Sequence, residues 1–161
     1  MRGSRTTIDE QLSKLPSAQS VEEVRGIEAQ AAKQYWVIVA ALLPEEVGFK
    51  HRIPRSRMVP GERLDSFNLA LNVGYGVLRG VVWKAIFMAG LNPYISFLHK
   101  PRAGKMTLVF DLMEEFRPIV VDRPLLAAFR RDFKQFERLA ENDREAFGGL
   151  WLTGFTAPNH P

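Results

Sequence analysis

Apolar residues recur at helical spacing along most of this chain, and no alternating pattern typical of β-strands continues for more than a few residues. The clearest helical segment begins at Ser20, where the sequence SVEE has the form of a capping box. In such a box, the hydroxyl and the last carboxylate satisfy backbone amides that a helix start leaves unpaired. Apolar positions then recur as far as Leu43, and Pro44 follows. The sequence therefore predicts a long core helix over residues 21–43 and an all-α fold.

A second helix is expected to begin after Asp65 or Ser66, since either side chain can cap a helix N-terminus. Its apolar stripe ends at Gly90, with Pro93 just beyond, which is typical of a helix C-terminus. We expect this helix to be mostly buried as well. The connection over residues 44–65 contains prolines, glycines and basic residues and is expected to be irregular.

Two further helices are expected nearer the C-terminus. A short one should cover about residues 108–116, and another about residues 125–139, where leucine and phenylalanine side chains line one side. Pro118 and Pro124 mark the entry to the second of these helices and separate it from the first. The sequence from Gly148 onward is expected to be frayed.

The length of 161 residues fits one domain with an ordinary core. We expect a flexible leader or short helix over residues 1–19, a helical domain over residues 20–147 and a flexible tail over residues 148–161. The chain has no cysteine, which excludes disulfides, thiolate catalysis and Cys-based metal sites. A metal would have to use oxygen ligands and histidines, so we expect a hard ion.

The sequence predicts no membrane segment. The longest uninterrupted apolar run, Tyr35–Leu43, has nine residues, against about 20 for a helix that crosses a bilayer. The opening residues also lack the apolar core of a secretory signal. A cytoplasmic location is therefore expected.

Basic charge is concentrated in two connecting segments, although the net charge is only +4, from 22 Lys and Arg against 18 Asp and Glu. The basic residues are Lys50, Arg52, Arg55, Arg57 and Arg63 in the first segment and Lys100, Arg102 and Lys105 in the second. Such clusters are typical of phosphate binding, but a solvated loop has the same composition. Charge alone leaves both interpretations open.

Glu28 is predicted to lie inside the apolar stripe of the first long helix. At about 100° per residue its direction falls between those of Tyr35 and Val39. A carboxylate there loses solvation unless it is neutralised, paired with a base or bound to a cation. Glu28 is thus either a buried partner of an arginine on another helix or a metal ligand.

Asp111, Glu114 and Glu115 share one face of the short helix over residues 108–116. Three carboxylates so close repel one another, and a divalent cation would relieve the repulsion. A solvated acidic face has the same spacing. His99 ends an apolar run just before the second basic segment, where it is either a structural residue or a ligand.

Four blocks of sequence, in order and with their spacing, resemble a known family. They are RGIEAQAAKQYW at 25–36, NLALNVGYGVLRG at 68–80, GLNPYISFLH at 90–99 and LVFDLMEEFRP at 108–118. Together they resemble the catalytic helical domain of the CRISPR adaptation integrase, the metal-dependent DNA endonuclease that inserts new spacers into CRISPR arrays. The resemblance covers about residues 20–133, and it implies phosphodiester cleavage and transesterification.

The resemblance also implies a site for Mg²⁺ or Mn²⁺. In that family the ion is bound by a Glu on the first long helix, a His after the Gly-Leu-x-Pro turn and an acid in the following DLxEE helix. These positions fall on Glu28, His99 and Glu114, with Asp111 as a neighbouring catalytic acid. Two carboxylates and one imidazole suit either ion, which would polarise the scissile phosphate and activate a water or a DNA 3′-hydroxyl.

The partners that the resemblance implies are DNA, held along its backbone by the two basic segments, a second copy of the chain and a small companion protein of the CRISPR adaptation complex. Two departures stand against it. Ala29 occupies a position that is usually Gly in the family, and we expect this chain to lack the family's N-terminal β-rich domain. The alternative function is a catalytically silent helical module for DNA binding or assembly, or a truncated fragment of the integrase.

Overall fold

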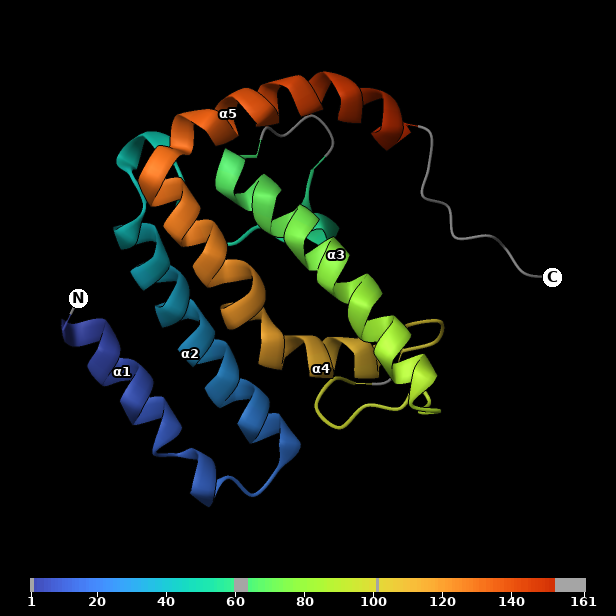
Figure 1. Cartoon of the computed structure of the whole chain (residues 1–161). Coiled ribbons are helices and arrows are strands. Elements are labelled where there is room, and N and C mark those ends of the chain that lie inside the picture. Colours follow the sequence, from blue (N-terminus) through green and yellow to red (C-terminus); the bar gives the residue numbers. More distant parts are fainter. Residues whose placement is uncertain (1, 60–63, 101, 153–161) are drawn as a thin grey trace.

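The computed structural model describes residues 2–59, 64–100 and 102–152, and every regular element in these ranges is helical (Figure 1). The α-helices are α1 (Arg2–Leu12), α2 (Val21–Leu42), α3 (Ser66–Met88), α4 (Thr107–Phe116) and α5 (Arg123–Leu152). The shorter elements are the 3₁₀ turns η1 (Leu15–Ser17), η2 (Glu45–Val47) and η3 (Arg55–Arg57), and the π-helical segment η4 (Arg117–Asp122). The all-α prediction is confirmed.

The long helix α2 begins as the sequence predicts. The Ser20 hydroxyl accepts a hydrogen bond from the Glu23 N–H at 3.2 Å, and Glu23 Oε2 accepts one from the Gln19 N–H at 2.7 Å. The carboxylate thus reaches one residue further back than in the usual capping box. The helix ends at Leu42, within one residue of the expected end. Helix α1, which forms within the predicted leader, lies alongside α2 (Figure 1).

Helix α3 begins at a predicted cap and ends at a left-handed glycine. The Asp65 carboxylate accepts a hydrogen bond from the Asn68 N–H at 2.8 Å. At the other end Gly90 has a φ of +68°, a conformation that residues with a Cβ avoid. The Leu91 N–H then donates to the Ile86 carbonyl at 3.1 Å, which is the bond of a Schellman motif. Both ends of α3 agree with the sequence prediction.

The hydrophobic core contains side chains from α2, α3, α4 and α5. Phe67 at the start of α3 contacts Phe49 and Phe129 edge to face, with ring centroids 5.1 and 5.0 Å away. Phe67 and Phe129 are completely buried, and Val109 and Met113 of α4 are almost completely buried. This core holds α4 against α3 and so fixes the residues on the opposite face of α4.

The backbone does not break between α4 and α5, although the sequence predicts two separate helices there. It widens into η4 and continues without a loop. Pro118 has no N–H to donate to the Glu114 carbonyl, and in a regular α-helix its ring would clash with that carbonyl. A π turn absorbs this mismatch. Burial of Val121 and Asp122 holds the widened turn against the protein.

Helix α5 extends beyond the expected end near residue 139. It passes a kink at Asp132, where φ is −157° and ψ is 79°, and continues to Leu152. Part of the tail predicted over residues 148–161 therefore belongs to this helix, and residues 153–161 lie outside the described residues. Among the described residues, no helix combines the length and the apolar character that a membrane crossing needs.

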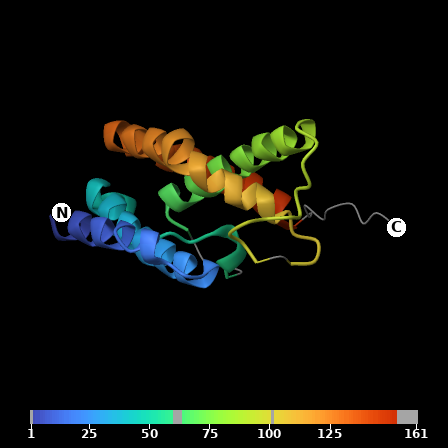
Figure 2. The ribbon, with the colours of Figure 1, turned by 90° about the horizontal axis from the view of Figure 1, so that it is seen from below.

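A loop over residues 89–106 carries the chain from the end of α3 back to the start of α4 (Figures 1 and 2). Two hydrogen bonds close it. The Leu108 N–H donates to the Pro93 carbonyl at 3.0 Å, and the Thr107 hydroxyl donates to the Tyr94 carbonyl at 3.0 Å. The loop therefore lies against α4, which brings the histidine near its end to the acidic residues of that helix.

Candidate functional site

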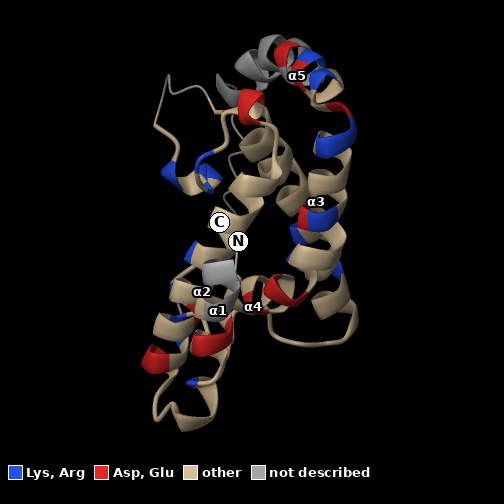
Figure 3. Ribbon diagram, turned by 90° about the vertical axis from the view of Figure 1, so that its left-hand side faces the viewer, with Lys and Arg blue, Asp and Glu red and all other residues tan. Residues whose placement is uncertain are grey.

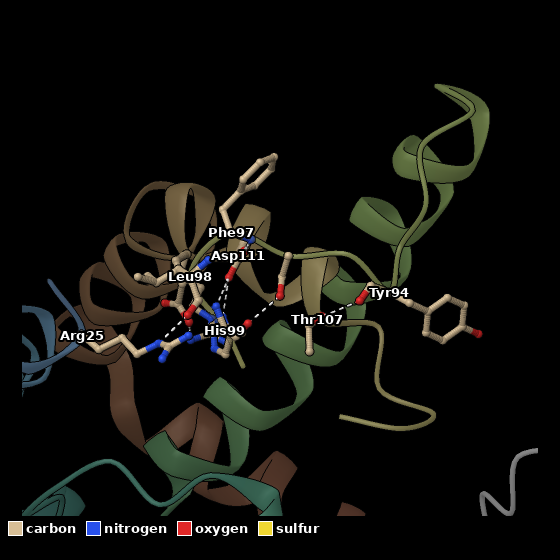
Figure 4. A network of polar contacts seen from close by, with 10 residues as sticks. Arg25, Tyr94, Phe97, Leu98, His99, Thr107 and Asp111 are labelled. Carbon is tan, nitrogen blue, oxygen red and sulfur yellow. Dashed lines mark hydrogen bonds and ion pairs between the residues drawn. The ribbon is translucent and has the colours of Figure 1, made fainter. Parts of the chain in front are cut away.

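Asp111 of α4 holds the last part of the loop over residues 89–106 through four contacts (Figure 4). Its Oδ2 accepts hydrogen bonds from the N–H groups of Phe97 and Leu98 at 2.7 and 3.0 Å. Its Oδ1 accepts one from the His99 N–H at 3.0 Å and lies 2.5 Å from His99 Nδ1. We call this arrangement the Asp111 clamp.

Hydrogen bonds within the Asp111 clamp favour the charged form of Asp111. Burial acts to raise the pKa of Asp111, but the hydrogen bonds from Leu98, from the His99 ring and from the other amides outweigh it and lower this pKa below its ordinary value. A charged carboxylate can only accept hydrogen bonds, so the shared proton lies on Nδ1 of His99. Nε2 is left as the ring nitrogen that faces away from Asp111, and a carboxylate on Nδ1 is a usual way in which proteins orient a metal-binding histidine.

Arg25 of α2 ties the first long helix to this loop. Its Nε donates a hydrogen bond to the Leu98 carbonyl at 2.5 Å, and one terminal nitrogen pairs with Glu22 at 3.0 Å (Figure 4). Sequence reasoning did not find Arg25, because the two bonded residues are 73 positions apart. Its effect is to hold the N-terminal half of α2 beside the Asp111 clamp.

Glu114 lies about one turn beyond Asp111 on α4, which carries the acidic residues marked red on this helix in Figure 3. It forms an ion pair with Arg117. Burial raises the pKa of Glu114 above its ordinary value, and the Glu28 carboxylate raises it further, while the charges of Arg117 and His99 oppose the rise. Glu28 and His99 are therefore each within electrostatic range of Glu114.

The prediction that Glu28 is buried in an apolar stripe is wrong, because the structure exposes this residue. Periodicity identifies the more apolar side of α2, but the core covers only its C-terminal half. Val39 is the buried residue of α2, whereas Val21 at the other end is 43% exposed. The desolvation argument for a ligand at Glu28 therefore fails, and its nearness to Glu114 is the observation that remains.

The three predicted ligands offer an imidazole nitrogen and two carboxylates, a set that suits Mg²⁺ or Mn²⁺. The orientation of His99 by Asp111 and the repulsion between the Glu28 and Glu114 carboxylates both fit a cation between them. Within the described residues, however, no three such side chains converge closely enough to enclose an ion. The three predicted ligands therefore have suitable chemistry for the ion, but in this conformation they are not close enough together to coordinate it.

The first basic segment contains both outward and inward side chains. Lys50, Arg55 and Arg57 are exposed, and the last two belong to η3. Arg63 lies outside the described residues. Exposed cations on an irregular segment are accessible to a nucleic-acid backbone.

Arg52 of the same segment turns inward. Its terminal nitrogens donate to Asn68 Oδ1 at 3.1 Å and to Asn72 Oδ1 at 2.7 Å, and its guanidinium carbon lies 5.1 Å from the centroid of the Tyr75 ring. Asn68 is completely buried and also accepts a hydrogen bond from the Ile53 N–H at 2.8 Å. Arg52 therefore fastens the basic segment to α3, which leaves it fewer donors for phosphate.

The second basic segment follows the Asp111 clamp directly. Lys100 Nζ lies 3.5 Å from Glu22 Oε1, and Arg102 and Lys105 are exposed. These three cations adjoin His99 in sequence, so a phosphate held by them would lie near the predicted ligands.

Sequence reasoning missed a buried carboxylate in η4. Asp122 of η4 is 3% exposed and accepts hydrogen bonds from the Tyr35 and Tyr75 hydroxyls at 2.9 and 2.5 Å. Burial raises the pKa of Asp122, although the two hydroxyls and nearby Arg117 oppose the rise. Two tyrosines within apolar stripes were the sequence signal, because a buried hydroxyl needs a partner.

A scan against known families matches residues 1–153 to the family described as CRISPR associated protein Cas1. Among curated relatives, a CRISPR-associated endonuclease Cas1 of Saccharolobus solfataricus is 56% identical over 111 residues, which are 69% of this chain and 30% of that protein. The Cas1 endonuclease of Hyperthermus butylicus is 43% identical over 68% of this chain and 30% of its own length. The chain thus spans about a third of the length of these relatives.

Two solved structures resemble the fold. A casposase bound to its integration product superposes with a TM-score of 0.67 and 35% identity, covering 76% of this chain and 33% of the casposase. A CAS1 protein from Thermotoga maritima superposes with a TM-score of 0.65 and 28% identity, covering 77% of this chain and 39% of that protein.

Proposed function

Because the chain belongs to the Cas1 family of CRISPR-associated proteins, we propose that it is the helical catalytic part of a metal-dependent DNA endonuclease and integrase. The reaction class is phosphodiester cleavage and transesterification, with DNA as the substrate. The Asp111 clamp carries the proposal, because it presents the His99 ring beside Glu114 on residues that the family model matches. The relatives are named endonucleases, and the casposase is bound to an integration product.

In this proposal Glu28, His99 and Glu114 hold Mg²⁺ or Mn²⁺. When bound, such an ion polarises a phosphate and makes a water or hydroxyl more acidic. Asp111 occupies the Nδ1 side of the His99 ring, so Nε2 would be the nitrogen that binds the ion. The Arg117 guanidinium favours the charged form of Glu114 and so opposes the rise in its pKa that burial causes.

The DNA backbone is proposed to run over the exposed cations of the two basic segments, which are Lys50, Arg55, Arg57, Lys100, Arg102 and Lys105. Cations bind phosphate without reading sequence, so these residues would fix the position of the DNA relative to the ion. Arg52 supports this surface from below by holding its segment on α3.

We also propose that the chain pairs with a second copy and with a small companion protein, in the cytoplasm where its DNA substrate lies. Exposed apolar side chains on α3 support association, since Val77, Phe87 and Met88 are 65, 71 and 86% exposed. Light scattering over a range of concentrations tests the dimer. A mass of one chain at every concentration would contradict it.

The decisive experiment is Glu28→Gln, which removes a charge and keeps the size of the side chain. Mn²⁺-dependent cleavage of DNA should be lost in this variant, whereas the melting temperature without metal should stay the same because Glu28 is exposed. Glu46→Gln is the matched control, since Glu46 is exposed near the other end of α2. Cleavage at the full wild-type rate in Glu28→Gln would contradict the proposed site.

The alternative is a catalytically silent helical module that binds DNA. It predicts metal-independent DNA binding and no cleavage in either protein. DNA affinity is therefore measured with EDTA and with Mn²⁺ beside the cleavage assay. Binding that depends on the basic segments, with no cleavage and no Glu28-dependent uptake of Mn²⁺, would favour the silent module.

A further inference from the structure

Arg117 makes contacts on two sides. It opens η4 and pairs with Glu114 Oε1 on α4, while its guanidinium carbon lies 4.8 Å from the centroid of the Tyr75 ring on α3. Its Nε is buried and has no hydrogen-bond partner among the described residues. Within the described ranges, the guanidinium contacts the aromatic ring and Glu114, and its charge also acts on the nearby Asp122 carboxylate.

Tyr75 is itself fixed. Its hydroxyl donates to Asp122 Oδ1 at 2.5 Å, and the guanidinium carbon of Arg52 lies 5.1 Å from its ring centroid. Arg52 is anchored in turn by Asn68 and Asn72. An unbroken series of contacts thus joins the buried residues of α3 and η4 to the carboxylate of Glu114.

From these contacts we propose that Arg117 is a positioning residue, held by Tyr75, that aims the Glu114 carboxylate at the divalent ion. The inference rests on the proposed function and adds a residue that sequence reasoning did not find. Arg117 engages Oε1, and no hydrogen bond to Oε2 occurs among the described residues, so the second oxygen is available to a ligand. A planar guanidinium stacked on a ring is preorganised for this task, whereas a lysine ammonium is not.

The ion pair between Arg117 and Glu114 is not expected to serve mainly to stabilise the fold. An ion pair three residues apart on a helix contributes little to folding when it is partly exposed, and here the two side chains are 26% and 32% exposed. If Arg117 acted only through its charge, it would weaken ion binding, because a cation beside the site repels Mn²⁺. Its removal would then strengthen ion binding, so the sign of the effect separates positioning from simple electrostatics.

The experiment measures Mn²⁺ binding by electron paramagnetic resonance of the free ion, with the full chain and without DNA. Arg117→Lys keeps the charge but loses the planar fork, and Arg117→Gln loses both. We expect both to weaken Mn²⁺ binding by about tenfold or more, as is typical when a partner that orients a metal ligand is lost. Arg130→Gln is the matched control, since Arg130 is exposed on α5.

Tyr75 provides a second arm of the test. Tyr75→Leu removes the ring that holds the Arg117 guanidinium and should weaken Mn²⁺ binding like the Arg117 variants. Circular dichroism and melting without metal report whether each variant folds. If Arg117→Gln does not fold, Arg117→Lys and Tyr75→Leu still decide the question.

The possible outcomes are distinct. The positioning role would be overturned if Arg117→Lys left Mn²⁺ binding unchanged or if Arg117→Gln strengthened it. The proposed function would remain intact in that case, provided that Glu28→Gln abolished the Mn²⁺ binding of the wild-type protein. Wild-type protein that takes up no Mn²⁺ in a Glu28-dependent way would overturn both, because no ion site would exist to be positioned. Equal weakening by the Arg117 variants and Tyr75→Leu supports both.

Discussion

Asp111 shows at the scale of one residue how a carboxylate can act on a site through its neighbours. It accepts three backbone hydrogen bonds and holds the His99 ring, yet it needs no contact with an ion to do so. Sequence reasoning grouped Asp111 with Glu114 because both lie on one helix face. The structure separates their environments, since the pKa of Asp111 is lowered and that of Glu114 is raised.

Replacing Asp111 by Asn tests the Asp111 clamp. A lowered pKa in the folded state means that the charged form stabilises the fold, fully above the unfolded-state pKa, and that this contribution is lost as the pH falls through the folded-state pKa. Asp111→Asn should cost about 2 kcal/mol at pH 7, the size of one charged hydrogen bond. Melting between pH 7 and pH 3 should then decline less in the variant. Glu115→Gln, on an exposed neighbour, should match wild type throughout.

The pKa of Asp122 is shifted in the opposite direction from that of Asp111, so it has the opposite effect on how stability depends on pH. Its raised pKa means that the charged form is disfavoured by the fold, so stability is lost as the pH rises from the unfolded-state pKa through the folded-state pKa. Asp122→Asn removes that cost and can still bond Tyr35 and Tyr75, so urea denaturation at pH 7 should place it within about 1 kcal/mol of wild type. Asp122→Ala orphans two buried hydroxyls and should lose about 2 kcal/mol or more. Equal losses of stability in Asp122→Asn and Asp122→Ala would contradict the prediction that Asp122 serves mainly as the hydrogen-bond partner of the two tyrosines.

At the scale of elements, local signals were enough wherever a boundary depends on local chemistry. The cap at Ser20 and the glycine at Gly90 were both predicted, because each satisfies backbone groups within a few residues. The π turn at Pro118 was not predicted. A proline indicates only that a regular α-helix is disturbed at that position. Whether the helix ends there or widens into a π turn depends on how Val121 packs against α3.

The same limit explains what was missed in the candidate site. The predicted ligands Glu28, His99 and Glu114 came from motif resemblance, and the structure brings the first two each within electrostatic range of Glu114. Arg117 and Tyr75 could not be found in this way, because their contact joins two helices. Periodicity also assigned Glu28 to an apolar face without showing how much of α2 the core covers.

The contact between α3 and η4 can be tested with two glycines on one helix. A Cβ at Gly74 would lie 2.7 Å from Val121 Cγ1, whereas a Cβ at Gly76 meets nothing within 4 Å. Gly76→Ala should therefore stabilise the protein by about 0.5–1 kcal/mol through helix propensity. Gly74→Ala should be less stable than Gly76→Ala by about 1–3 kcal/mol because of overpacking. Adding Val121→Ala to Gly74→Ala should reduce that difference, and an unchanged difference would exclude the predicted clash.

For the molecule as a whole, the location of the charged residues is more informative than the net charge. The net charge of +4 is small, but both connecting segments carry exposed cations, at residues 50–57 and 100–105, whereas α4 carries three acidic residues and no basic one (Figure 3). Separate regions of opposite sign suit the proposed function, in which the basic segments would bind phosphate and the acidic residues a cation.

The salt dependence of DNA binding tests this division. Arg55 and Arg57 are exposed on η3, and each phosphate contact adds about −0.9 to the slope of log affinity against log salt. Replacing both by Ala should flatten the slope by about two units if both bind phosphate. The same change at Lys14 and Lys33, which are exposed away from the basic segments, should leave it unchanged. An unaltered slope in the Arg55 and Arg57 variant would remove η3 from the DNA path.

The π-helical segment η4 acts as a phase shift in one continuous helix. Each residue of an α-helix advances the direction of its side chain by about 100°, and a π turn holds one residue more than an α turn. On one side of η4 the helix presents Glu114 to the site, and on the other it presents Phe129, completely buried, to the core. Ile119 and Val120 are 64% and 55% exposed, so substitution there should be tolerated while deletion is not. Losing a single residue would turn one end of the helix by more than a quarter of a rotation, so that the core and the site could no longer both be in register.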